Sequence, residues 1–91
     1  MKTKENIKDK QENSGVKNGL HFLVLHNDEV NTFDFVIDAL MDVCEHTLIQ
    51  AEQCTILVHY KGKASVKSGT YNELKSKCSK LLDLGLSAEI A

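Results

Sequence analysis

The sequence has no proline, no arginine and no long hydrophobic run among its 91 residues. No stretch approaches the roughly 18 consecutive apolar residues that predict a membrane span, so we expect no membrane partner. The first residues contain lysines without a hydrophobic segment behind them, which argues against a secretory signal. The acids among these residues, and the missing arginines, argue against an organelle transit peptide. We therefore expect a cytoplasmic protein.

Cysteine is also scarce, and its placement indicates reduced thiols. The three cysteines, Cys44, Cys54 and Cys78, are an odd number scattered within apolar patterns rather than a disulfide framework. A chain of this length fits one domain. With 42% hydrophobic residues, that domain can bury a small core.

The net charge of −2 hides an uneven distribution along the chain. Residues 20–60 contain seven acids and no lysine, whereas residues 61–91 contain six lysines and three acids. An acidic centre repels nucleic-acid backbones and attracts cations. The C-terminal lysines lack interleaved aromatic residues, so we expect no nucleic-acid partner.

The hydrophobic pattern divides the chain into a polar arm at residues 1–19 and a core domain at residues 20–91. The arm is predicted to be disordered, and its composition leaves open whether it has a function or is a plain tail. The core domain predicts the element order βααβαβ, with a small three-stranded sheet packed against two or three helices. The expected elements are a strand at 20–25, a helix capped at Asn31, a helix capped at Thr47 and closed by Gly62, a strand at 63–67, a helix capped at Thr70 and ended by Gly85, and a strand at 86–90.

Two short segments carry the polar chemistry. Asn27, Asp28 and Glu29 follow the first predicted strand directly, and His59 stands where a helical pattern stops. If the fold joins them, they form a small acidic socket with a histidine acceptor, which suits an ammonium group. The alternative is structural, because Asn and Asp stabilise turns and histidine is favoured at helix C-termini.

Catalytic and metal sites are poorly supported. Structural zinc prefers close ligand pairs, whereas Cys44, His46, Cys54 and His59 are spaced differently and the cysteines lie on apolar faces. Free cysteine on such a face usually acts as a small hydrophobic residue. We expect no catalytic residue, no metal and no cofactor.

The segment from Leu20 to Lys63 closely resembles ClpS, the adaptor of ATP-dependent Clp proteases in bacteria. The matching segments are His26-Asn27-Asp28-Glu29, Phe35-Val36-Ile37-Asp38 with Leu40, Ala51-Glu52-Gln53, and Val58-His59-Tyr60-Lys61-Gly62-Lys63. The resemblance implies a compact α/β domain, an α+β sandwich similar to the C-terminal domain of the ribosomal stalk protein.

The resemblance also implies a non-enzymatic function. Members bind proteins whose N-terminal residue is bulky and hydrophobic (N-degrons) and hand them to an AAA+ Clp unfoldase of ClpA or ClpC type. The roles that the resemblance assigns are binding of the α-amino group by Asn27, Asp28 and His59, a hydrophobic pocket of Phe33, Val36, Thr55 and Val58, and unfoldase docking by Glu73 and Lys77. It further implies that the N-terminal arm engages the unfoldase.

The sequence departs from the common family pattern at the pocket. Many members carry methionine where this chain has Phe33, and another methionine where it has Thr55. One rival interpretation is a general protein-interaction module of the same fold with a different ligand. A second rival is a small metal-binding or cysteine-dependent protein.

Overall fold

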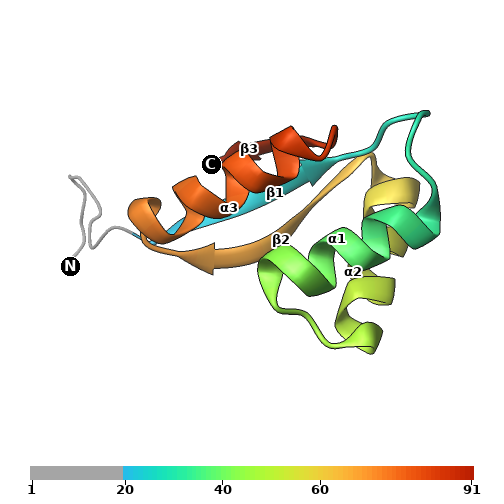
Figure 1. Ribbon diagram of the computed structural model, residues 1–91, viewed down its shortest axis with the longest axis horizontal. Coiled ribbons are helices and arrows are strands. Elements are labelled where there is room, and N and C mark those ends of the chain that lie inside the picture. The colour runs from blue at the N-terminus through green and yellow to red at the C-terminus, as the bar shows by residue number, and fades with distance from the viewer. Residues whose placement is uncertain (1–19) are drawn as a thin grey trace.

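The computed structural model describes residues 20–91, and the predicted arm at residues 1–19 lies outside the described residues. The elements follow the predicted order βααβαβ, which confirms the α+β class (Figure 1). They are β1 (His21–His26), α1 (Phe33–Cys44), α2 (Leu48–Lys61), β2 (Lys63–Gly69), α3 (Tyr71–Asp83) and β3 (Ser87–Ile90).

The three strands form one antiparallel sheet in the order β2-β1-β3, so the first strand of the chain lies in the middle. Leu25 pairs with Ala64 of β2 on one side and with Ala88 of β3 on the other. Along β1, Leu23 and Leu25 are buried, whereas Phe22 is exposed. This alternation indicates that the helices cover one face of the sheet, as predicted.

The core lies between that sheet face and the three helices. Leu40 comes from α1, and Leu74 and Leu81 come from α3; all three are fully buried against the sheet leucines. Burying one such side chain contributes roughly 1.5–3 kcal/mol relative to exposure. Across residues 20–91, no helix combines the length and apolar character needed to cross a bilayer.

Local capping fixes where two of the helices begin. Thr47 and Gln50 form a reciprocal capping box at α2, with donor–acceptor distances of 2.9 and 3.2 Å. Thr70 and Glu73 do the same at α3, at 3.0 and 3.2 Å. Gly62 ends α2 with a φ of 88°, a left-handed conformation that glycine adopts without steric cost. These three predictions are confirmed.

The predicted cap of α1 is wrong by one residue. Thr32, rather than Asn31, is the N-cap, because its hydroxyl oxygen accepts a hydrogen bond from the Phe35 amide at 3.1 Å. The side chain of Asn31 is engaged with Asp28 and with the carbonyl of Gly85 instead. The strand boundaries also differ slightly from the prediction: β1 is shifted by one residue, β2 extends to residue 69, and β3 begins at residue 87.

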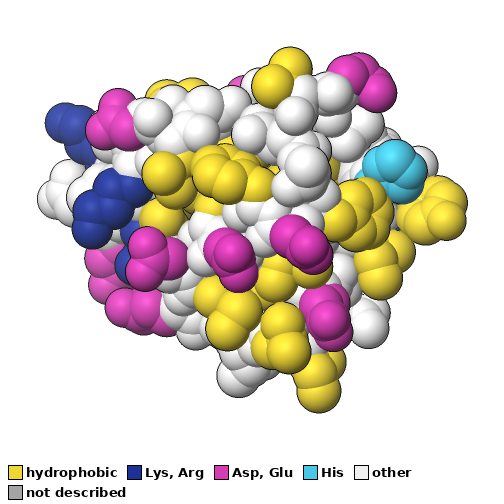
Figure 2. Space-filling model, turned by 45° about the vertical axis from the view of Figure 1, so that its right-hand side comes forward, with side chains coloured by type: hydrophobic (Ala, Val, Ile, Leu, Met, Phe, Trp, Pro, Cys, Tyr) yellow, Lys and Arg dark blue, Asp and Glu magenta, His cyan; other side chains and the backbone are white. Residues whose placement is uncertain are grey.

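The surface formed by α1 and α2 mixes acidic and hydrophobic side chains. Asp34, Asp38 and Asp42 are exposed along α1. Figure 2 views the molecule from this side, where acidic side chains alternate with hydrophobic ones. The acids that cluster in the sequence at residues 20–60 therefore lie partly on this face, interspersed with exposed hydrophobic side chains.

Candidate functional site

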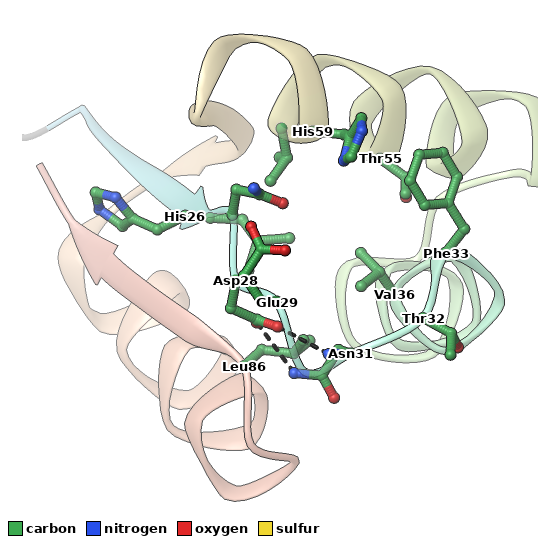
Figure 3. Close-up of a pocket in the computed structure, with 13 residues that line it drawn as sticks. His26, Asp28, Glu29, Asn31, Thr32, Phe33, Val36, Thr55, His59 and Leu86 are labelled. Carbon is green, nitrogen blue, oxygen red and sulfur yellow. Dashed lines mark hydrogen bonds between the residues drawn. The ribbon is translucent and has the colours of Figure 1, made fainter.

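A cavity of about 190 Å³ opens where the β1–α1 loop meets the second half of α2. Its walls come from the end of β1, the start of α1, α2 and the turn before β3 (Figure 3). All seven residues predicted to bind the substrate line it: Asn27, Asp28, Phe33, Val36, Thr55, Val58 and His59. These seven residues, up to 32 positions apart in the chain, thus meet at one site.

One backbone hydrogen bond brings the two polar segments together. The amide of Asn27 donates to the carbonyl of Gly62 at 2.8 Å. Gly62 can present that carbonyl because its left-handed conformation turns the chain sharply from α2 into β2. The end of β1 is therefore tied to the end of α2, and Asn27 lies on the same cavity as His59.

Asp28 organises the loop that carries it. Its Oδ1 accepts hydrogen bonds from the backbone amides of Val30 and Asn31, both at 2.8 Å, and its Oδ2 accepts one from Asn31 Nδ2 at 3.0 Å. Figure 3 shows the carboxylate turned toward Asn31. The turn-stabilising interpretation of Asp28 is therefore correct as far as the fold is concerned.

These contacts also keep Asp28 negatively charged. The backbone amide of Asn31 is the main cause that lowers the pKa of Asp28, with smaller contributions from the Asn31 side chain and the Val30 amide, while partial burial opposes them. An ionised carboxylate has about four acceptor sites. Three are used within the loop, so one on Oδ2 remains for a ligand.

His59 lies in the last turn of α2 and is held by aromatic neighbours. Its ring meets Phe33 edge-on, with centroids 5.2 Å apart, and meets Tyr60 at 5.3 Å. Such contacts contribute roughly 0.5–1.5 kcal/mol beyond burial. The two rings therefore pack against the imidazole from two directions, while His59 remains exposed to a ligand.

The other half of the cavity is hydrophobic. Val36 of α1 faces Thr55 of α2 across it (Figure 3), and Val58 is buried beside Thr55. Phe33 is 44% exposed, which places it at the rim rather than in the core. The cavity therefore has polar acceptors on one side and an apolar wall on the other.

Glu29, which the sequence placed in the acidic socket, also lines the cavity, whereas five further lining residues were not predicted from the sequence: Leu25, His26, Asn31, Thr32 and Leu86. Leu86 is buried and reaches the site because β3 pairs with the central strand. Asn31 Nδ2 also donates to the carbonyl of Gly85 at 3.1 Å, which joins the β1–α1 loop to the turn before Leu86. The apolar run at residues 20–25 predicted a buried strand that includes Leu25, but no local pattern identified Leu86.

The two residues predicted for unfoldase docking lie elsewhere, on α3. Glu73 accepts a hydrogen bond from the amide of Thr70 at 3.0 Å as part of the helix cap. Lys77 Nζ donates to the carbonyl of Val43 at 3.2 Å and so caps the end of α1. Both side chains therefore have a structural role in the isolated domain.

The cysteines do not contribute to the cavity lining. Cys44 and Cys78 are buried, and Cys54 is partly buried. Burial raises the pKa of all three thiols. Since the thiolate is the nucleophile, these environments favour the inert protonated form.

Comparison with known proteins gives one consistent family. The family described as ATP-dependent Clp protease adaptor protein ClpS matches residues 17–89. A Campylobacter jejuni ClpS adapter is 33% identical over 64 residues, covering 70% of this chain and 67% of the relative. An Acetivibrio thermocellus ClpS adapter is 36% identical over 58 residues, covering 64% and 59%.

The fold agrees with a solved structure from the same family. Agrobacterium tumefaciens ClpS2 bound to L-phenylalaninamide superposes with a TM-score of 0.78 at 21% identity, covering 82% of this chain and 98% of that one. The family model, the sequence relatives and the similar fold therefore agree with one another. The chain belongs to the ClpS family of ATP-dependent Clp protease adaptor proteins.

Proposed function

We propose that this chain binds proteins that begin with a bulky hydrophobic residue and delivers them to an AAA+ Clp unfoldase. The observation that carries the proposal is the cavity itself, in which an acidic and amide-bearing loop and a histidine adjoin a hydrophobic wall. A protein N-terminus combines an ammonium group with a side chain two bonds away. The two halves of the cavity match these two groups.

The polar half has the acceptors that an ammonium group needs. An ammonium has three N–H donors. The side-chain oxygen of Asn27, the free acceptor site of Asp28 and a neutral ring nitrogen of His59 supply three acceptors on one cavity. A hydrogen bond to a charged group contributes roughly 1.5–3 kcal/mol, so loss of the ammonium charge removes much of the binding energy.

The cavity has a size that suits a large side chain beside an amine. Its polar and hydrophobic halves together measure about 190 Å³, whereas an apolar cavity of about 150 Å³ is enough to bind benzene. Phe33, Val36, Thr55 and Val58 would surround the first side chain, with Leu86 at the far wall. Burying a leucine or phenylalanine side chain contributes roughly 2–3 kcal/mol. After the entropy of association is subtracted, we expect micromolar affinity.

The family supports the adaptor role. ClpS members are adaptors of Clp proteases, and the structure of Agrobacterium ClpS2 contains L-phenylalaninamide, a molecule with a free amine and a benzyl side chain. Binding requires no chemical step. The protein would therefore act by holding the substrate while the Clp enzyme unfolds and degrades it.

Delivery requires a second contact, with a ClpA- or ClpC-type unfoldase. We assign that contact to the surface of α3 around Glu73 and Lys77, and to the N-terminal arm at residues 1–19 during hand-over. The α3 surface is separate from the cavity, so substrate and unfoldase can bind at the same time. Lys77 would have to share its ammonium between the Val43 carbonyl and the partner.

The test is a set of peptides that differ only at residue one. Peptides that start with Phe, Leu, Tyr or Trp should bind, and those that start with Gly, Asp or Val should not. A reporter protein with a Phe N-terminus should then be degraded faster by a reconstituted Clp protease when the adaptor is added. Equal binding of both peptide sets would refute the proposal and favour an interaction module with another ligand.

A further inference from the structure

One hydroxyl group stands in the hydrophobic wall of the cavity. Of the residues in the described range 20–91, Thr55 is the only buried polar one, at 3% exposure. It lies on α2, four residues and about 6 Å of rise before His59. Figure 3 shows it between His59 and the α1 residues Phe33 and Val36, on the side of α2 that faces the cavity.

The Thr55 hydroxyl already donates one hydrogen bond but can still accept another. Thr55 Oγ1 donates to the carbonyl of Ala51 at 2.7 Å, one turn back along the same helix. A hydroxyl oxygen also has two lone pairs. No protein donor is paired with this oxygen in the described part of the chain. The hydrophobic wall of the cavity therefore offers a fixed acceptor one helical turn from His59, on the side of the cavity that would hold the first side chain.

From this we infer that Thr55 is a specificity-determining residue that favours first residues with an N–H or O–H donor at the tip of an aromatic side chain, namely tyrosine and tryptophan. This inference rests on the proposed function, since it concerns the side chain held in that cavity. Leucine and phenylalanine fill the same space but leave the acceptor without a partner. The site would thus rank substrates by polarity at the tip as well as by size.

The physical basis is the cost of burying an unpaired polar group. A tyrosine hydroxyl that loses its water without gaining a partner is penalised by roughly 1–3 kcal/mol. Thr55 Oγ1 would accept the proton of that hydroxyl and remove the penalty. The same acceptor would serve the indole N–H of tryptophan, a group that is only a donor.

The experiment is a double-mutant cycle between ligand and protein. Peptides that start with Phe and with Tyr are titrated against wild type, Thr55→Val and Thr55→Ser. Valine keeps the shape and removes the hydroxyl, whereas serine keeps the hydroxyl and removes a methyl group. We expect the Tyr-to-Phe affinity ratio to fall by about three- to tenfold in Thr55→Val and to stay near wild type in Thr55→Ser.

A ligand-side control keeps the inference testable if a variant folds poorly. In wild type, a peptide that starts with 4-methylphenylalanine, which has the length of tyrosine but no donor, should bind more weakly than the Tyr-first peptide. An unchanged Tyr-to-Phe ratio in Thr55→Val, or equal binding of tyrosine and 4-methylphenylalanine, would overturn the inference while leaving the adaptor function intact. Absence of binding by every free N-terminus would instead refute the proposed function.

Discussion

Replacing Asp28 should separate its structural role from its role in binding. In Asp28→Ala, the loop loses the acceptor of three hydrogen bonds, from the amides of Val30 and Asn31 and from the Asn31 side chain. The carboxylate is only half-buried, so water replaces part of each bond. By comparison with the loss of a helix cap, we expect a cost of about 1–2 kcal/mol. For a domain of this size, that corresponds to a fall in Tm of roughly 5–15 °C.

The matched variant is Asp28→Asn, which keeps an acceptor oxygen for the two backbone amides but has no charge. It should retain most of the stability, because only the bond from Asn31 Nδ2 is directly lost. Both variants should bind a Phe-first peptide about 10- to 100-fold more weakly, because each lacks the charge-assisted bond to the ammonium group. Thermal unfolding by circular dichroism and peptide titration by fluorescence anisotropy measure the two effects separately. Wild-type affinity in Asp28→Asn would refute the assignment of the carboxylate to the ammonium group.

The lowered pKa of Asp28 predicts how this stability depends on pH. The unfolded-state value is about 3.9, and the folded-state value lies below it. The stabilisation is therefore fully present above about pH 4 and is lost as the pH falls through the folded-state value. The difference in Tm between wild type and Asp28→Ala should be constant from neutral pH to about pH 5 and should shrink in stronger acid. A difference that persists unchanged at pH 2 would show that the ionised carboxylate is not its source.

Three further predictions concern the rim, the histidine and the docking surface. Phe33→Ala should admit Val-first and Ile-first peptides, because it opens the rim that Phe33 forms against His59; continued rejection of both, measured by titration, would show that Phe33 is not a gate. His59→Ala should weaken binding of a Phe-first peptide more than His59→Gln does, because the glutamine side chain still offers an oxygen that accepts a hydrogen bond; equal affinities of the two variants, measured by titration, would remove His59 from the amine site. Lys77→Ala should weaken binding to the unfoldase more than the control Lys75→Ala, an exposed lysine on the same helix, in a pull-down assay; equal effects would move the docking site elsewhere.

Local sequence chemistry predicted the elements of the fold well. The capping boxes at Thr47 and Thr70 and the glycine at position 62 each depend on residues close together in the chain, so their consequences can be read without the tertiary structure. The cap of α1 was misplaced because Asn31 and Thr32 are both good capping residues. Asn31 does not cap the helix because its side chain is bonded to the Asp28 carboxylate and the Gly85 carbonyl. Gly85 is 54 positions from Asn31 in the chain, so this contact cannot be read from the local sequence.

The polar half of the site was easier to predict than its hydrophobic half. Asn27, Asp28 and His59 stand out in the sequence because polar residues directly follow apolar segments. Leu86 resembles any other leucine after a turn, and only the pairing of β3 with β1 brings it to the cavity. Thr55 was expected in the pocket from the family resemblance, but the burial of its hydroxyl could be recognised only once the neighbouring side chains were in place.

The most direct test of the account compares two peptides that start with phenylalanine and differ only by an acetyl group on the N-terminal nitrogen. Both peptides present the same side chain to the hydrophobic wall, but only one presents an ammonium group to Asn27, Asp28 and His59. We predict micromolar binding of the free peptide and at least roughly 30-fold weaker binding of the acetylated one, since a charge and two donors are lost. Equal affinity for the two peptides would show that this protein does not recognise the free N-terminus of its substrate.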